Sequence, residues 1–92
     1  MQNNKRRGRL EVVFSILSII KDNRNSIKPT PLLRKSNLSS ARFNEYLSEL
    51  VEKGFVRIIE DRNGKLLTLT DKGFKYLERY GTIVSFIDDF GL

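Results

Sequence analysis

Cysteine, histidine and tryptophan are all absent from this sequence of 92 residues. Without cysteine there is no disulfide and no thiolate ligand, and without histidine the commonest general base is missing. These absences exclude most zinc sites, thiol nucleophiles and every serine–histidine–aspartate triad. A carboxylate- or lysine-based enzyme remains possible, but the 11 acidic residues are scattered at helix-surface spacings. We therefore expect no enzyme, no metal and no cofactor.

Long apolar runs are also absent, and the longest are too short to span a bilayer. The basic N-terminus leads into an amphipathic pattern and not into the apolar segment of a signal peptide. The lack of cysteine fits a reducing compartment. We expect a single cytoplasmic domain with a thin core and no membrane partner.

Positive charge is concentrated in the first half of the chain, whose overall net charge is +6. Residues 1–44 hold ten Lys and Arg against two acids, whereas residues 45–92 hold seven against nine. This uneven distribution favours a basic surface that binds a polyanion such as nucleic acid. An ordinary solvated surface could have the same distribution of charge.

Apolar spacing predicts the first two helices. The first runs from about Arg9 to Asp22, and a short second helix ends near Ser36, with Thr30 as its N-cap and Pro31 in the first turn. The apolar stripe of the first helix is Leu10, Val13, Phe14, Leu17 and Ile20, widened by Val12, Ile16 and Ile19.

A third helix is predicted from a cap at Ser39 or Ser40 to about Lys53, and Gly54 is expected to end it in the left-handed conformation. Its apolar face consists of Phe43, Tyr46, Leu47, Leu50 and Val51.

The period then changes to that of a β-hairpin. Residues 55–60 and 66–69 are β-branched or apolar and flank an Asn63-Gly64 turn. Thr70 is expected to cap a last helix, whose stripe contains Phe74, Leu77, Tyr80 or Gly81, Val84 and Ile87. The order helix, short helix, helix, hairpin, helix predicts an α+β winged helix-turn-helix fold.

Five segments in order carry a family resemblance over about residues 7 to 80. They are Arg9-Leu10-Glu11-Val12-Val13, Asn37-Leu38-Ser39, Tyr46-Leu47 with Leu50, Glu52-Lys53-Gly54-Phe55-Val56, and Leu69-Thr70-Asp71-Lys72-Gly73. The chain resembles small archaeal winged-helix DNA-binding proteins of the Sulfolobus nucleoid-protein type and related predicted transcriptional regulators. The resemblance implies DNA binding and a C-terminal helix that forms an antiparallel coiled-coil dimer arm. Here that arm is shorter, and we divide the chain into a basic arm (1–8), a winged-helix domain (9–70) and a dimer helix (71–92).

The third helix is the expected reader of the major groove, through its first turns. Arg42 can grip guanine O6 and N7 together, Asn44 can read adenine, and Ser39 and Ser40 can bond phosphate. Glutamates later in the helix would repel phosphate and restrict contact to its start. Alternatively, Arg42 is a surface residue paired with Glu45 or Glu49.

Basic residues flanking this helix are the expected phosphate ligands. They come from the second helix, the wing and the N-terminal arm, although the wing pair could merely aid solubility and the arm could be a disordered tail. The residues are Arg34 and Lys35; Arg62 and Lys65; and Lys5, Arg6, Arg7 and Arg9.

Aromatic residues divide into a core set and a surplus. Phe14, Phe43, Phe55 and Phe74 fall on apolar stripes and are expected in the core. The last helix is apolar on more than one side, which favours a homodimer interface. That interface is predicted to contain Tyr76, Tyr80, Ile83, Val84, Phe86, Ile87 and Phe90.

These observations predict a homodimeric regulator of transcription that binds double-stranded DNA and is associated with the nucleoid. One alternative is a sequence-independent chromatin protein, because base readers are few and phosphate ligands many. Another is a winged-helix module that binds protein, which the glutamates on the third helix would suit. RNA binding is less favoured, since the surplus aromatics cluster on the dimer helix. No motif for a small-molecule ligand is present.

Overall fold

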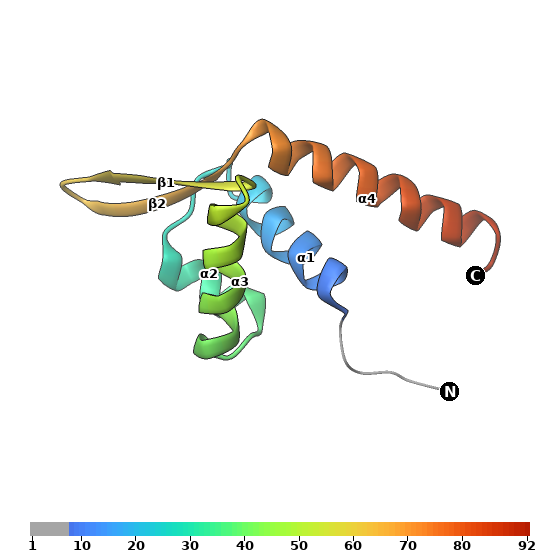
Figure 1. Ribbon diagram of the computed structural model, residues 1–92, viewed down its shortest axis with the longest axis horizontal. Coiled ribbons are helices and arrows are strands. Elements are labelled where there is room, and N and C mark those ends of the chain that lie inside the picture. The colour runs from blue at the N-terminus through green and yellow to red at the C-terminus, as the bar shows by residue number, and fades with distance from the viewer. Residues whose placement is uncertain (1–7) are drawn as a thin grey trace.

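The computed structural model of the protein describes residues 8–92, so the predicted arm residues Lys5, Arg6 and Arg7 lie outside it. Helices α1, α2 and α3 pack together, the hairpin projects from one side of them, and α4 extends on the other side (Figure 1). The elements are α1 (Arg9–Asp22), α2 (Pro29–Ser36), α3 (Ser40–Glu52), β1 (Val56–Asp61), β2 (Gly64–Leu69) and α4 (Asp71–Asp89). The predicted order of elements and the α+β winged-helix fold are confirmed.

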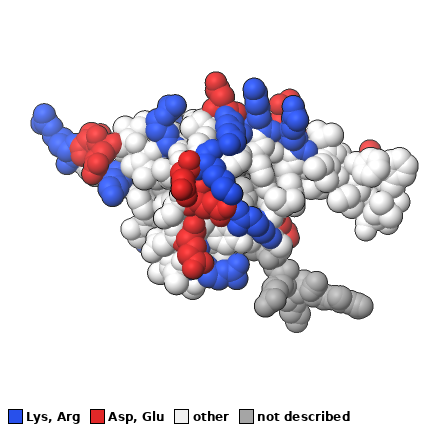
Figure 2. Space-filling view, viewed as in Figure 1, with Lys and Arg blue, Asp and Glu red and all other residues white. Residues whose placement is uncertain are grey.

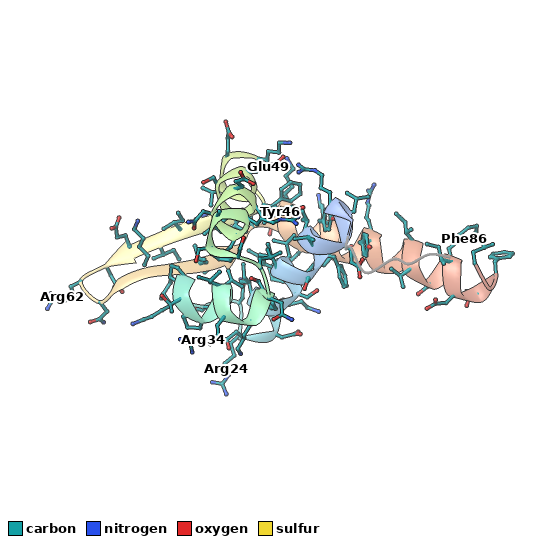
Figure 3. The ribbon with its side chains drawn as sticks, turned by 90° about the horizontal axis from the view of Figure 1, so that it is seen from below. Arg24, Arg34, Tyr46, Glu49, Arg62 and Phe86 are labelled. Atoms are coloured by element: carbon teal, nitrogen blue, oxygen red, sulfur yellow. The ribbon has the colours of Figure 1, made fainter. Side chains whose placement is uncertain are left out.

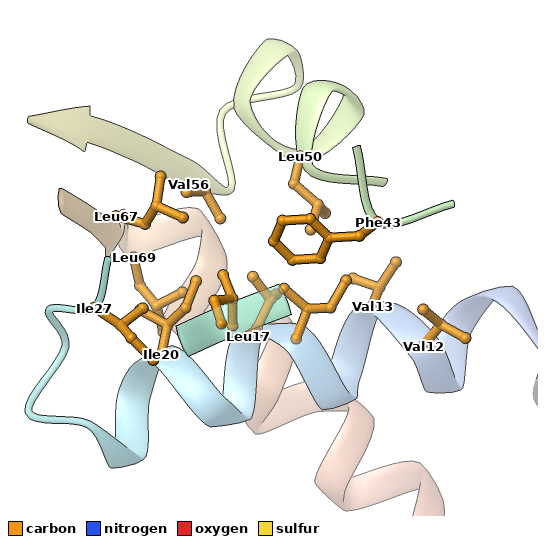
Figure 4. Packing of buried hydrophobic residues seen from close by; sticks show 12 residues of the cluster. Val12, Val13, Leu17, Ile20, Ile27, Phe43, Leu50, Val56, Leu67 and Leu69 are labelled. Carbon is orange, nitrogen blue, oxygen red and sulfur yellow. The ribbon is translucent and has the colours of Figure 1, made fainter. Parts of the chain in front are cut away.

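The core is centred on α1, which contacts α2, α4 and β2 (Figure 4). Five residues of α1 are buried, and Ile27, Leu32 of α2 and residues of α3 and the hairpin complete the cluster. The placing of Leu10 in this stripe was wrong, because its side chain is 58% exposed and lines a groove beside α4. The buried α1 residues are Val12, Val13, Ile16, Leu17 and Ile20.

Helix α2 begins two residues earlier than predicted. Its N-cap is Lys28 and not Thr30, and Pro29 occupies the first turn. A residue before proline is forced toward extended backbone, and Lys28 has a ψ of 154°. Pro31 is tolerated because amides in the first turn have no partner within the helix.

The turn between α2 and α3 is held by two serines. Ser36 is buried, and its hydroxyl donates to the Leu33 carbonyl at 2.7 Å and accepts the Leu38 amide at 3.3 Å. Asn37 takes the left-handed conformation at φ 63°, which asparagine tolerates. Of the two predicted caps, Ser39 or Ser40, it is Ser39 that caps α3 by accepting the Arg42 amide at 3.2 Å. This turn sets the angle at which α3 starts.

The hairpin forms the predicted wing, with a turn one residue earlier than the Asn63-Gly64 pair suggests. Val56 pairs with Leu69 and Asp61 with Gly64, so Arg62 and Asn63 form the turn. Gly64 has φ 114° at the start of β2, a conformation that favours glycine. A bridge between Ile27 and Leu67 joins the base of the wing to the body.

Helix α4 packs on the body only through its first half. Thr70 caps it, as predicted, by accepting the Gly73 amide at 3.2 Å. Gly73 is buried, and a Cβ there would lie 2.5 Å from the Phe55 carbonyl oxygen. Phe74 was wrongly predicted as core: it is 39% exposed. Because α4 approaches the body at Gly73, the neighbouring Phe74 lies on the rim of that contact.

Candidate nucleic-acid interface

The start of α3 forms one side of an open hollow of about 580 Å³ between α2 and α3. Arg34 from α2 lies there beside the exposed Ser39 and Ser40, so three predicted DNA ligands are brought together. No acidic residue lines this hollow. We call it the serine hollow; its lining is Thr30, Leu33, Arg34, Asn37, Leu38, Ser39 and Ser40.

Arg42 faces a different hollow on α3, about 190 Å³ in volume, which we call the glutamate hollow. Its guanidinium lies 5.8 Å from the centroid of the Tyr46 ring, which is within cation–π range. Among residues 8–92 Arg42 makes no ion pair, so the alternative pairing with Glu45 or Glu49 is not observed. The lining residues are Arg9, Arg42, Glu45, Tyr46 and Glu49.

Glu49 is engaged by two cations across this hollow. Arg9 forms an ion pair with it, and the Lys53 ammonium lies 2.8 Å from its carboxylate. The hydrogen bond from Arg9, followed by that from Lys53, lowers the pKa of Glu49 to about 2. The same hydrogen bond raises the pKa of Arg9. Glu49 is therefore ionised, with its charge balanced locally.

Arg9 was wrongly assigned to the basic arm. It is the first residue of α1, and it is held by an acid on α3 that is far away in the sequence. Local spacing carries no signal for this contact, because it depends on the packing of α1 against α3.

The glutamates of α3 lie on a different side of the body from Arg24 and Arg34 (Figure 3). Figure 2 shows Asp and Glu side chains gathered over α3, near the centre of the view. Arg24 and Arg34 lie on the opposite side from Glu49 (Figure 3). A duplex approaching α3 is therefore attracted more strongly from the side that carries Arg24 and Arg34.

Arg24 is a cation that the sequence analysis did not single out. It has φ 60°, and the following Asn25 has φ 56°. The Asn25 side-chain oxygen accepts the Leu69 amide at 2.8 Å, which ties this loop to the hairpin. The Asn23-Arg24-Asn25 run was a sequence signal for this loop, because asparagine tolerates left-handed backbone and favours turns.

The wing brings further cations together. Lys28 and Lys65 line one hollow of about 330 Å³ with Asn63 and Asp61, and Arg62 lies at the wing tip (Figure 3). Lys28 was also missed, although its place before Pro29 was visible in the sequence. Lys35 on α2 and Asn44 on α3 are exposed, as a DNA contact requires.

The predicted dimer residues divide into two groups. The Tyr76 hydroxyl donates to the Leu10 carbonyl at 2.7 Å, and Tyr80 stacks on Phe14 at 4.7 Å, so both tyrosines pack on their own body. Phe14 is accordingly half-buried against α4 and not in the central cluster. The other five are exposed on the second half of α4 and at its C-terminal cap: Ile83, Val84, Phe86, Ile87 and Phe90.

Three helices, a serine-capped turn and a two-stranded wing define a winged helix-turn-helix protein. The chain belongs to the winged helix-turn-helix family, whose sequence profile matches residues 6–87. No curated protein matches the chain in sequence. Among residues 8–92, no helix has the length and apolarity needed to cross a membrane, and no group of acidic side chains is arranged to hold a metal ion.

Solved structures with this fold include three from different sources. Sso10a-2, a DNA-binding protein from Sulfolobus solfataricus, is 20% identical with a TM-score of 0.75. The match covers 91% of this chain and 85% of Sso10a-2. The F-93 protein of SSV1 is 25% identical with a TM-score of 0.70, and the match covers 96% of this chain and 95% of F-93. The PcaV transcriptional regulator from Streptomyces coelicolor is 18% identical with a TM-score of 0.75, and the match covers 86% of this chain and 60% of PcaV.

Proposed function

We propose that this chain binds double-stranded DNA as a homodimer, catalyses no reaction and acts as a regulator of transcription. The observation that carries the proposal is the serine hollow, where an arginine and two exposed hydroxyls gather at the start of α3 with no carboxylate beside them. The Sulfolobus and Streptomyces proteins with the same fold, one DNA-binding and one a transcriptional regulator, support it. Such a protein would act in the cytoplasm, at the nucleoid.

The start of α3 enters the major groove in this proposal. Ser39, Ser40 and Arg34 bond phosphates that border the groove, while Arg42 and Asn44 reach base edges. For Arg42 this requires leaving the Tyr46 ring, an exchange of one weak contact for a bidentate one.

Cations outside α3 fix the orientation of the duplex. Arg62 and Lys65 reach the backbone or the minor groove from the wing, and Lys35 reaches phosphate from α2. Arg24 and Lys28 join them, since they lie beside α2 and the wing. Because phosphate contacts carry no sequence information, this group contributes affinity and salt dependence. The basic arm, residues 1–8, also contributes to affinity and salt dependence.

Dimerisation occurs through the second half of α4, within the dimer helix (71–92). Four large apolar side chains of that half are exposed, as is Phe90 at its C-terminal cap. Contiguous apolar patches of this kind on small proteins usually mark a partner surface. A dimer would present two copies of α3 to two half-sites.

A sequence-independent chromatin role is the second candidate, favoured by the six cations around α2 and the wing against two candidate base readers. Fluorescence anisotropy with a labelled duplex, competed by bulk DNA at several salt concentrations, distinguishes a regulator from a chromatin protein. A regulator retains a preferred duplex under competition, whereas a chromatin protein loses all preference. Absence of binding at low salt would refute both.

Arg42→Ala tests the placement of the recognition helix. We expect affinity for the preferred duplex to fall about tenfold and the preference over bulk DNA to shrink. Lys21→Ala, an exposed cation of α1 that lines a hollow beside α4, is the matched control. If the two variants bind alike, α3 is not the reader.

A further inference from the structure

A groove of about 320 Å³ lies beside the first half of α4, and we call it the α4 groove. The first turn of α1 and the residue just before β1 form its other walls. Three of its lining residues are cations, and none is acidic: Lys72, Lys75 and Arg79. The rest of the lining is apolar or aromatic and consists of Leu10, Phe55, Tyr76, Tyr80 and Ile83.

The aromatic part of this lining is held in place by contacts within the chain. Phe55 meets Tyr76 edge-on, with ring centroids 5.7 Å apart. The Tyr76 and Tyr80 rings lie nearly parallel, 6° apart in plane and 5.9 Å apart in centroid. The Tyr76 hydroxyl also donates to the Leu10 carbonyl at 2.7 Å. Because these contacts are all made within the chain, the groove is preformed, and a ligand need not order it on binding.

Positive charge at the groove is not balanced within the chain. Among residues 8–92, neither Lys75 nor Arg79 forms an ion pair. Glu78 lies next to Arg79 in the chain, but it lines a different hollow between α1 and α4. Figure 2 shows Lys and Arg side chains over the first half of α4 and an almost uncharged surface over the second. The α4 groove therefore attracts an anion.

Volume and lining together narrow the class of ligand. Pockets that hold small molecules have volumes from about 300 Å³ upward and combine an apolar lining with a few polar groups. The α4 groove is near that lower bound, so it accommodates one fused ring system and not a folded element of another protein. A phosphate group alone would leave the aromatic lining uncovered, and an uncharged aromatic molecule would leave the cations unbalanced.

We propose that the α4 groove binds a small molecule that carries a carboxylate on an aromatic ring system. The rings lie against Tyr76 and Tyr80, between Leu10 and Ile83. The carboxylate lies between Lys75 and Arg79, which are neighbours on one side of the helix because they are four residues apart. The inference goes beyond the proposed function and does not depend on it, since none of these residues lines the serine hollow.

The sequence contains no motif for such a ligand because the site is assembled from three separate segments. Leu10, Phe55 and the first half of α4 meet only when α4 folds back on the body beside α1. The tyrosines alone were visible in the sequence, as surplus aromatics on the last helix.

An NMR titration with naphthoate, the carboxylate of naphthalene, measures both the affinity and the location of binding. We expect a Kd on the order of 0.1 mM, which suits a ligand of this size. The largest shifts should occur in the ring signals of Tyr76 and Tyr80 and in the methyl signals of Leu10. Naphthalenemethanol, which has the same rings without the charge, should bind about tenfold more weakly. Inorganic phosphate should not displace naphthoate.

Leu10→Glu tests the apolar part of the site. It places a carboxylate against the ligand, so we expect the Kd for naphthoate to rise at least about thirtyfold. The Leu10 side chain is exposed and lies in the first turn of α1, where an acid suits the helix dipole, so the variant should fold. Ile59→Glu, the same change at an exposed apolar residue of the wing, is the matched control and should leave the Kd unchanged.

Arg79→Gln tests the charged part of the site. We expect the Kd for naphthoate to rise about fivefold while the Kd for naphthalenemethanol stays the same, since only the carboxylate loses a partner. A purely structural effect of the substitution would weaken both ligands equally. Lys21→Gln, which removes a cation from a different hollow, is the control. Circular dichroism checks that every variant is folded.

Three outcomes would overturn the inference. Naphthoate that fails to bind at millimolar concentration, or binds no better than naphthalenemethanol, would exclude an aromatic carboxylate. Displacement by phosphate, or equal losses in Lys21→Gln and Arg79→Gln, would reduce the effect to net charge. Binding that weakens as the protein is raised from tens to hundreds of micromolar would show that a second copy of the chain covers the groove. Absence of duplex binding in the anisotropy assay concerns only the proposed function.

Discussion

The serine hollow and the glutamate hollow lie on two sides of the same helix, yet their electrostatics differ. The first combines Arg34 with hydroxyl groups and contains no acid. The second contains two carboxylates, and one of them, Glu49, already binds Arg9 and Lys53. One side of α3 is thus open to an external anion, whereas the other side satisfies its charges internally. A helix can carry several glutamates and still bind DNA if they face away from the duplex. Arg42 lines the glutamate hollow, so it has to turn toward the start of α3 to reach a base.

Reversing the charge of the serine hollow has the largest expected effect. Arg34→Glu replaces a cation with an anion beside Ser39 and Ser40, so we expect DNA affinity to fall about thirtyfold at low salt. Anisotropy titration of a labelled duplex measures this. Lys21→Glu, with the same charge change away from the hollow, is the control; an equal loss there would mean that only net charge matters.

Removing the cap of α3 tests how the serine hollow is built. Ser39→Ala leaves the Arg42 amide without its acceptor and lowers the free energy of unfolding by about 1 kcal/mol. Ser40→Ala removes a neighbouring hydroxyl that caps nothing and leaves stability unchanged. Urea denaturation compares the two, and equal stabilities would contradict the role of Ser39.

Neutralising the acid of the glutamate hollow has a smaller effect, in the opposite direction. Glu49→Gln frees Arg9 and Lys53 from their ion pairs, so we expect DNA affinity at low salt to rise about threefold. The same anisotropy titration applies, with Glu78→Gln on α4 as the control. A decrease in affinity would show that the ion pairs hold α3 in its binding position.

The pH dependence of stability also tests the internal charge balance of the glutamate hollow. It is the smallest of the expected effects. The pKa of Glu49 is lowered in the folded chain from its usual 4.5 to about 2, with the Arg9 hydrogen bond as the main cause. Its ionisation therefore stabilises the fold fully above pH 4.5, and this contribution is lost as the pH falls toward 2. The Tm difference between the parent chain and Glu49→Gln should be constant from pH 5 to 7, shrink below pH 4.5 and vanish only below pH 2. A difference that persists unchanged at pH 2 would contradict this.

Local signals predicted the elements of this fold well. The caps at Ser39 and Thr70, the left-handed Gly54 and the apolar spacing of α3 all depend on neighbours within a few residues. The start of α2 was misplaced even so, because two prolines in close succession both fit a first turn, and Pro29 is the first of them.

Tertiary contacts account for the other errors. The ion pair of Arg9 with Glu49 joins two helices distant in sequence, so no spacing rule could reveal it. Leu10 and Phe74 have helical spacing with core residues, but they lie where the body leaves the helix uncovered. Periodicity identifies the apolar side of a helix and not how far along it the neighbouring elements extend.

Backbone amide NMR of the labelled chain, titrated with its preferred duplex, tests the central claim most directly. The account predicts that the largest shifts occur at residues 34 and 39–42, in and beside the serine hollow, with smaller ones at the wing, residues 62–65. Amides of the second half of α4 should remain unshifted. Shifts confined to α4, or absent from the start of α3, would contradict DNA recognition by this helix.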